Sequence, residues 1–232
     1  MPGSKRRRGD LLRPSSSREL LSPGTMRYRF VAIEGPPGVG KTVLAKRIAE
    51  ALDGGTVLES EANPFLKDFH SGRPGSAFQA QVFFLLSRYR ELSQLAQREL
   101  FSQVKISDFI LPKDRIFAYL NLDDSELLLY EKIYRTLAAE VPSPELVIYL
   151  QAPAETLAKR LRRSPGPVPD DSTLREIVRA YDYFFFHYSA TPLLVVNASN
   201  VDFASPETSL DYLVQEIRLM PGGTRYYVPS SS

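Results

Sequence analysis

An eight-residue motif near the start of the chain constrains the fold more than any other feature. Residues 35–42 read Gly-Pro-Pro-Gly-Val-Gly-Lys-Thr and match the pattern G-x-x-x-x-G-K-[ST] at every fixed position. The motif directly follows an apolar stretch, Arg29–Ile33, and opens a stretch, Lys41–Leu52, whose apolar side chains have helical spacing. A strand, a glycine-rich loop and a helix in this order are typical of a phosphate-binding loop in an α/β protein.

The residue types of this loop suit the binding of a nucleotide phosphate. Glycines let backbone N–H groups curve around an anion, and the N-terminus of the following helix adds a favourable potential. Lys41 is expected to reach the outer phosphates, and the Thr42 hydroxyl to bind Mg²⁺. We therefore predict an ATP site formed by Gly35, Pro36, Pro37, Gly38, Val39, Gly40, Lys41 and Thr42.

Apolar runs alternate with helical patterns along the rest of the chain. Five apolar runs predict strands, at residues 29–33, 56–58, 104–107, 146–150 and 193–196. Stretches with helical spacing predict helices between and after these strands, at residues 41–52, 77–100, 125–139, 154–163, 173–188 and 207–219. Strands separated by helices form a parallel sheet that is covered on both faces. The sequence therefore predicts a three-layer α/β fold with a five-stranded parallel sheet flanked by helices.

The two ends of the chain differ in composition from the middle. Residues 1–25 are rich in Arg, Ser, Pro and Gly and cannot bury enough apolar surface to offset the entropy of ordering, so we expect a disordered basic leader. A transit peptide and a nucleic-acid-binding arm are the alternatives for this segment. Residues 26–220 are expected to form the folded domain, and residues 221–232, which begin Pro-Gly-Gly, a flexible C-terminal tail.

The composition excludes several classes of protein. Residues 1–26 carry six basic and two acidic side chains, which leaves 23 basic and 25 acidic ones in the rest of the chain, so a basic nucleic-acid-binding domain is not indicated. The chain has no cysteine and two histidines, which excludes thiolate and multi-histidine metal sites and fits a reducing compartment. No apolar run approaches the 18 or so residues of a membrane span. We expect a cytoplasmic protein, or an organellar one if residues 1–25 are a transit peptide, with no nucleic-acid or membrane partner.

Acidic residues follow two of the predicted strands. Glu59 comes after the strand at 56–58, with Glu61 as a competing candidate, and Asp108 comes after the strand at 104–107. Because ligands of open parallel sheets bind at the carboxyl ends of strands, both acids are expected beside the phosphate-binding loop. One carboxylate could orient the hydroxyl of an acceptor and the other could hold Mg²⁺ with Thr42, which is what a kinase requires. The alternative is that these acids only cap loops.

Arginines cluster at the end of the predicted helix 154–163. Arg160, Arg162 and Arg163 precede the Pro- and Gly-rich loop 164–169. The functional interpretation is a lid whose catalytic arginines, Arg160 and Arg163, close over the phosphates and exclude water. The alternative is the ordinary preference of positive charge for a helix C-terminus.

Several short motifs occur in a characteristic order. They are Ile33-Glu34-Gly35, Glu59 before Asn63-Pro64, Phe78-Gln79, Lys113-Asp114-Arg115-Ile116-Phe117 and the segment 150–163. This set, over about residues 28–203, resembles the deoxynucleoside kinases and most closely their bacterial deoxyadenosine/deoxyguanosine kinase branch. The resemblance implies an Arg-containing lid, transfer of the γ-phosphate of ATP with Mg²⁺ to the 5′-hydroxyl of a deoxynucleoside, a purine as the favoured base, and a homodimer.

The resemblance also implies roles for single residues. Glu59 would accept the proton of the 5′-hydroxyl, Gln79 would hydrogen-bond the base, and Phe117 would stack on it. Many relatives carry Glu-Arg-Ser after the third strand, where this chain has Ser107-Asp108-Phe109. Asp108 would then be the acid on the magnesium side. The arginine is missing, and Lys113 or Arg115 is expected to supply its charge near the acceptor.

Two other functions remain open from the sequence. A nucleoside monophosphate kinase of the thymidylate kinase type shares the phosphate-binding loop and the lid, but its charged acceptor needs additional cations. Between Glu59 and Gln79 only Lys67 and Arg73 are available, although Arg88 and Arg90 lie further along the same predicted helix. A regulatory nucleotide-binding protein would need the loop but no acceptor pocket.

Overall fold

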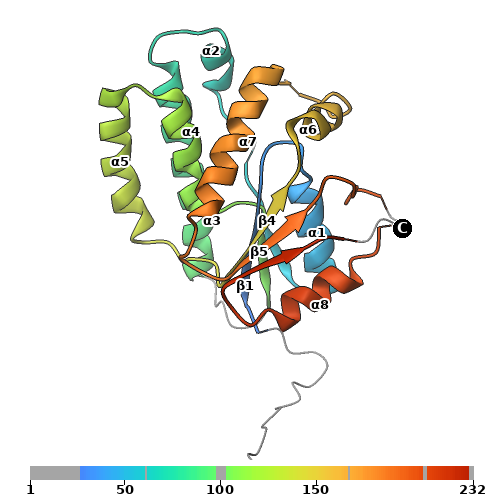
Figure 1. Cartoon of the computed structure of the whole chain (residues 1–232). Coiled ribbons are helices and arrows are strands. Elements are labelled where there is room, and N and C mark those ends of the chain that lie inside the picture. Colours follow the sequence, from blue (N-terminus) through green and yellow to red (C-terminus); the bar gives the residue numbers. More distant parts are fainter. Residues whose placement is uncertain (1–26, 61, 98–102, 167, 206–207, 230–232) are drawn as a thin grey trace, which may run out of the picture.

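A six-stranded parallel sheet forms the centre of the protein (Figure 1). The computed structural model describes residues 27–60, 62–97, 103–166, 168–205 and 208–229. The strand order is β2-β3-β1-β4-β5-β6 and all neighbouring strands are parallel. The strands are β1 (Phe30–Glu34), β2 (Gly55–Val57), β3 (Lys105–Ser107), β4 (Leu146–Gln151), β5 (Leu193–Asn197) and β6 (Thr224–Tyr227). This order places the loop after β1 between the ends of β3 and β4.

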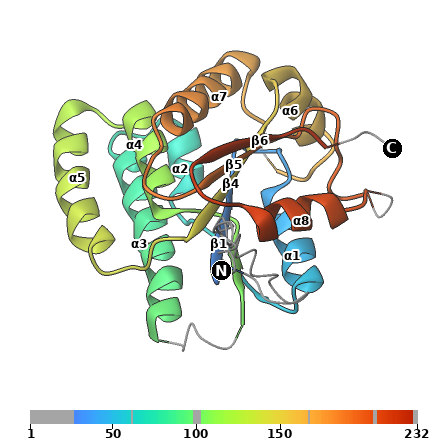
Figure 2. The ribbon, with the colours of Figure 1, turned by 60° about the horizontal axis from the view of Figure 1, so that its bottom comes forward.

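Helices cover both faces of the sheet because its central strands are apolar on both sides. All five residues of β1 are buried; Val31 and Ile33 belong to one core, and Phe30 and Ala32 contact the opposite layer. Helices α1 (Lys41–Ala51) and α8 (Asp211–Leu219) pack on the first face (Figure 2). Helices α3 (Ser76–Gln97), α4 (Asp114–Asn121) and α7 (Asp171–Phe186) pack on the second, and α5 (Asp124–Ala138) lies outside them against α3 and α4.

Shorter elements surround the carboxyl ends of the strands. Helix α2 (Leu66–His70) precedes α3, the 3₁₀ turn η1 (Leu111–Lys113) leads into α4, and α6 (Ala154–Leu161) follows β4. The segment expected to be the lid connects α6 to α7. Among the described residues, no helix is both long and apolar enough to cross a membrane.

The three-layer α/β architecture is confirmed, but the sheet has six strands instead of the predicted five. The additional strand, β6, lies within residues 221–232, so the expectation of a flexible tail was wrong for Thr224–Tyr227. This strand pairs with β5 alone, at the edge of the sheet, and three of its four residues are exposed. A strand with so little burial has no apolar run that the sequence could reveal.

The start of α5 was predicted to within one residue, since the helix begins at Asp124 and the prediction began at residue 125. Asp123 caps α5, and its side chain accepts hydrogen bonds from the backbone N–H groups of Ser125 and Glu126. Helix α8 begins at Asp211 and not at the predicted residue 207. Residues 206–207 of that predicted start, and the predicted leader 1–25, lie outside the described residues.

Candidate active site

A cavity of about 1030 Å³ opens beside the N-terminus of α1, where the sequence placed the phosphate-binding loop. Its walls come from the phosphate-binding loop and the start of α1, residues 59–60 after β2, helices α2 and α3, the segment from Asp108 to Asn121, the lid region, helix α7 and the loop after β5. This volume suits a site for small molecules. The predicted residues within its lining are Pro37, Gly38, Val39, Gly40, Lys41, Thr42, Glu59, Asp108, Phe117, Arg160 and Arg163.

The phosphate-binding loop has a backbone that depends on glycine at two positions. Gly38 and Gly40 have φ angles of +80° and +100°, which side chains other than glycine rarely adopt. A Cβ atom on Gly38 would also lie 2.7 Å from Cγ of Leu161 in α6. Lys41 begins α1 and its Nζ donates to the carbonyl of Gly35 at 2.8 Å. The open helix N-terminus and the curved glycine backbone fit an anionic phosphate chain.

Asp108 connects this loop to the candidate catalytic acid. One oxygen, Oδ2, accepts a hydrogen bond from the Thr42 hydroxyl at 2.5 Å, and the other, Oδ1, accepts one from the backbone N–H of Glu59 at 2.7 Å. A hydroxyl and a carboxylate side by side fit a magnesium ion that takes its other ligands from phosphates and water. Among the residues that the structure describes, no three acidic, histidine or cysteine side chains form a metal-binding group.

The Glu59 side chain lies between two cations. Its Oε1 accepts a hydrogen bond from Nη2 of Arg88 in α3, and its Oε2 accepts one from Nζ of Lys113 at 2.6 Å. Burial by itself would raise the pKa of Glu59, but the positive charges of Lys113 and Arg88 outweigh it and lower that pKa to about 2. Glu59 is therefore a carboxylate at neutral pH, as a group that accepts a proton must be.

A second glutamate lies beneath the site and was not predicted to have a role. Glu34, at the end of β1, is fully buried and accepts hydrogen bonds from the backbone N–H groups of Gly35 and Ile110. Burial raises its pKa, and the charges of Lys113 and Lys41 oppose that shift. Desolvation also lowers the pKa of Lys41, and the neighbouring charge of Lys113 adds to this effect.

Helix α3 and helix α7 form the end of the cavity beyond Glu59. Gln81, Phe84 and Arg88 project from α3, and Phe117 and Tyr181 lie at a ring-centroid distance of 6.1 Å in an edge-to-face arrangement. Arg88 forms a buried ion pair with Asp114. An aromatic pair next to an amide and a guanidinium can contact both the face and the edge of a planar base.

The structure does not place Gln79 in this cavity. Gln79 is exposed, whereas Gln81 is buried, lines the cavity and donates from Nε2 to the backbone carbonyl of Asp114 at 3.0 Å. Positions two apart on a helix point about 200° away from each other, so both cannot face the same cavity. The structure therefore corrects the prediction of Gln79, because Gln81 and not Gln79 lies in the cavity.

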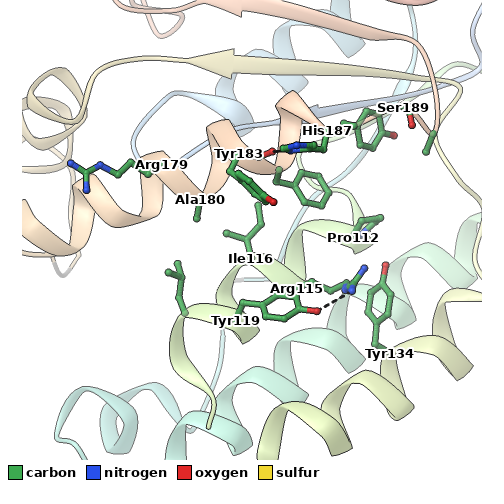
Figure 3. A pocket seen from close by; sticks show the side chains of 14 residues that line it. Pro112, Arg115, Ile116, Tyr119, Tyr134, Arg179, Ala180, Tyr183, His187 and Ser189 are labelled. Carbon is green, nitrogen blue, oxygen red and sulfur yellow. Dashed lines mark hydrogen bonds between the residues drawn. The ribbon is translucent and has the colours of Figure 1, made fainter. Parts of the chain in front are cut away.

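Arg115, the other predicted substrate residue, also lies elsewhere. Its Nε donates to Glu131 of α5 at 2.8 Å and its Nη2 to the Tyr119 hydroxyl at 3.2 Å. It faces a separate cavity of about 890 Å³ between α4 and α7, with Tyr119 and Tyr134 beside it and Tyr183 opposite (Figure 3). Lys113 and Arg115 are two residues apart at the start of α4, and only Lys113 turns toward Glu59.

The two lid arginines differ in their contacts. Nη2 of Arg160 donates to the carbonyls of Ala198, Ser199 and Val201 in the loop after β5, at distances of 2.8 to 3.3 Å. Burial lowers the pKa of Arg160. Arg163 is exposed and lines the cavity. The loop 199–204 that Arg160 holds also lines the cavity, and the sequence analysis did not single it out.

A pattern in the sequence could have identified the missed residues of α3. Ala77, Gln81, Phe84 and Arg88 follow one another at spacings of four, three and four residues, which place them on one face of a helix, and all four line the cavity. This face carries two polar side chains among apolar ones. Such a face is expected of a helix that borders a binding site.

Comparisons with known proteins agree with this geometry. The family model described as deoxynucleoside kinase matches residues 31–220. A deoxyguanosine kinase of Bacillus subtilis is 30% identical to this chain over 198 residues, which cover 82% of this chain and 96% of the relative. A deoxyadenosine kinase of Dictyostelium discoideum is 28% identical over 200 residues, which cover 82% of this chain and 80% of the relative. The structure of deoxyadenosine kinase from M. mycoides with bound dATP superposes with a TM-score of 0.67 at 23% identity, covering 81% of this chain and 98% of the other, which shows the shared fold. With its phosphate-binding loop and acceptor cavity placed as described, the chain belongs to the deoxynucleoside kinase family, whose members phosphorylate deoxynucleosides.

Proposed function

We propose that this kinase transfers the γ-phosphate of ATP, with Mg²⁺, to the 5′-hydroxyl of a purine deoxynucleoside. One observation carries the proposal: the backbone N–H of Glu59 donates to Asp108, which also accepts a hydrogen bond from the Thr42 hydroxyl of the phosphate-binding loop. This chain of contacts supports a role for Glu59 as the proton acceptor beside the phosphates. A deoxyguanosine kinase and deoxyadenosine kinases among the relatives support a purine acceptor.

Each residue then has a specific task in the reaction. The 5′-hydroxyl gives its proton to Glu59, its oxygen forms a bond to the γ-phosphorus, and the bond from that phosphorus to the bridging oxygen of the leaving ADP breaks. Lys41 and Arg163 stabilise the charge on the phosphates. Asp108 and Thr42 would hold Mg²⁺, which supplies further charge neutralisation at the phosphates when bound.

The acceptor end of the cavity favours a neutral nucleoside over a nucleoside monophosphate. The two cations next to Glu59 are both engaged by carboxylates, Lys113 by Glu59 and Arg88 by Glu59 and Asp114. A phosphate on the acceptor would have to compete with these carboxylates for its partners. We therefore favour a deoxynucleoside over thymidylate as the acceptor, with Gln81 at the edge of the base and Phe117 at its face.

The replacement of Glu59 tests the mechanism. Glu59→Gln keeps the size of the side chain and removes the ability to accept a proton, so we expect turnover to fall by about 10²- to 10⁴-fold while ATP affinity stays within about threefold of the wild type. Steady-state kinetics with a deoxynucleoside and calorimetric titration of ATP measure the two quantities. Glu50→Gln, an exposed position on α1, is the matched control and should behave as the wild type. Unchanged turnover in Glu59→Gln would remove Glu59 from the reaction.

We also propose that the enzyme is a homodimer that pairs through α4 and α7. Large apolar side chains are exposed on these helices, among them Tyr119, Tyr183 and Phe186, which is 84% exposed. Tyr119 and Tyr183 also line the open cavity between the two helices (Figure 3), and exposed apolar side chains of this size mark a surface that can pair with another chain. Sedimentation equilibrium of the wild type and of Phe186→Glu tests this proposal, because a charge on the interface should shift the protein to monomers.

A cytoplasmic location and a dispensable segment 1–25 remain proposals as well. A fluorescent fusion of the whole chain, compared with one that lacks residues 1–25, distinguishes a cytoplasmic enzyme from one carried into an organelle.

If the segment has no role in catalysis, its deletion should leave the kinase activity unchanged.

A further inference from the structure

Lys113 lies on the acceptor side of the cavity between two carboxylates. It ends the 3₁₀ turn η1 and is 3% exposed. Its Nζ is 2.6 Å from Oε2 of Glu59 and 3.8 Å from Oε1 of the fully buried Glu34. Lysine is almost never buried to this degree unless it is paired. Its charge is therefore tied to this site.

Lys113 completes the contacts that fix the Glu59 carboxylate. Oε1 of Glu59 is bound by Arg88, which is itself held by Asp114, and the Glu59 backbone N–H is bound by Asp108. Lys113 is the partner of the remaining oxygen, Oε2. Without it, one end of the carboxylate would lose its hydrogen bond and the side chain could rotate about the Arg88 contact.

The chain has no arginine directly after Asp108, where the sequence pattern of many deoxynucleoside kinases has one. That position is Phe109, which is fully buried in the core. The sequence left Lys113 and Arg115 as possible replacements. The structure excludes Arg115 from the site, because its guanidinium contacts Glu131 and Tyr119 at the separate cavity between α4 and α7.

We propose that Lys113 is a positioning residue for phosphoryl transfer. Its ammonium group holds Oε2 of Glu59 in place while Glu34 holds the ammonium group from the other side. Lys113 does not touch the reacting atoms and acts through its hydrogen bond to Glu59. This inference rests on the proposed function, because it assigns a task only if Glu59 receives the proton of the acceptor.

The replacement Lys113→Ala tests this task. Moving a reacting group by about 1 Å can lower the reaction rate by about 10²-fold. We therefore expect kcat of Lys113→Ala to fall by about that factor, while the affinity for ATP stays within about threefold of the wild type. Propylammonium has the atoms that the substitution removes beyond Cβ. Added to Lys113→Ala, it should restore kcat by about tenfold or more, an effect that a purely structural role of Lys113 does not produce.

Two further variants complete the experiment. Lys105→Ala changes a lysine at the start of β3, the end of the strand that lies away from Asp108 and the cavity. This control should keep wild-type kinetics with and without propylammonium. Lys113→Arg keeps the charge that the buried carboxylates need, so we expect it to fold even if Lys113→Ala does not. Because a planar guanidinium cannot occupy the place of an ammonium without moving Glu59, kcat of Lys113→Arg should fall by about tenfold at unchanged ATP affinity.

The outcomes separate this inference from the proposed function. Wild-type kcat in Lys113→Ala would overturn the positioning role, as would a loss in Lys113→Ala that propylammonium does not reverse. If Lys113→Ala fails to fold, wild-type kcat in Lys113→Arg overturns the role instead. If the wild type is active and Glu59→Gln is not, any of these results refutes the role of Lys113 alone. A wild type that phosphorylates no deoxynucleoside would refute the proposed function itself.

Discussion

Gln81 and Gln79 lie two positions apart on α3, and only Gln81 faces the cavity. The motif Phe78-Gln79 identified the right helix but not its rotation, because the rotation is fixed by which residues pack on the sheet. Leu85 and Leu92 of α3 are buried in the core with Phe30 of β1. That packing turns Gln81, Phe84 and Arg88 toward the cavity. The motif alone does not reveal this orientation, because it depends on residues outside the motif.

The pair of glutamines provides a prediction with its own control. Gln81→Ala removes an amide from the acceptor end of the cavity, so the KM for the deoxynucleoside should rise by about tenfold, equivalent to about 1.4 kcal/mol, the contribution of one or two hydrogen bonds. Gln79→Ala should leave the KM unchanged, since its side chain is exposed. Initial rates at varied deoxynucleoside and saturating ATP measure both. Equal effects of the two substitutions would contradict this placement of the base.

Other single residues were predictable because the chemistry of the site leaves few choices. Glu59 and Asp108 were found from their positions after two strands, and the parallel sheet brings them together as expected. Arg88 and Lys113 were harder to assign, because the charge of a side chain does not tell which way the side chain points. Both became partners of Glu59 only through the packing of α3 and η1 against the ends of the strands.

At the scale of elements, the lid and the loop after β5 act together. Arg160 of α6 donates to three backbone carbonyls of the segment 198–201. Arg47 of α1 binds the carbonyls of Phe203, Ser205 and Thr208 in the same way. Two guanidinium groups from different helices thus fix a loop that borders the phosphate-binding end of the cavity.

The contacts of Arg160 predict an effect on the phosphate donor. Arg160→Met removes the donor to three carbonyls and should loosen the loop 199–204, so the KM for ATP is expected to rise by about tenfold while the KM for the deoxynucleoside changes less than about twofold. Arg162→Met is the matched control, since Arg162 is exposed and contacts Asp171 across the lid. A fall in kcat at unchanged KM for ATP would show instead that Arg160 acts directly on the transferring phosphate.

The elements that the sequence did not reveal are those with weak local signals. Helix α4 has eight residues, and in the sequence its first residues stand out only as a motif. Its contacts with α3 and α7 join residues that are far apart in the chain. Strand β6 has exposed side chains and exists because its backbone pairs with β5. By contrast, β1, β4 and β5 are almost entirely buried and were evident as apolar runs.

At the scale of the whole molecule, a small set of charged groups meets in the candidate active site at one end of the sheet. The chain outside residues 1–26 is slightly acidic, and the cations that line the cavity are Lys41, Arg88, Lys113, Lys159, Arg160 and Arg163. Three of the carboxylates around them, Glu34, Asp108 and Asp114, are buried. We therefore expect the buried members of this set to act on a bound phosphate chain more strongly than they would in water.

We propose above all that this site phosphorylates a purine deoxynucleoside. The most direct measurement is a panel of deoxyguanosine, deoxyadenosine, deoxycytidine, thymidine and thymidylate, each incubated with ATP, Mg²⁺ and the purified whole chain, with the formation of ADP and of the new phosphate ester quantified. We expect the highest kcat/KM with deoxyguanosine or deoxyadenosine and no phosphorylation of thymidylate. Phosphorylation of thymidylate alone would contradict the account, and so would ATP binding without turnover of any acceptor.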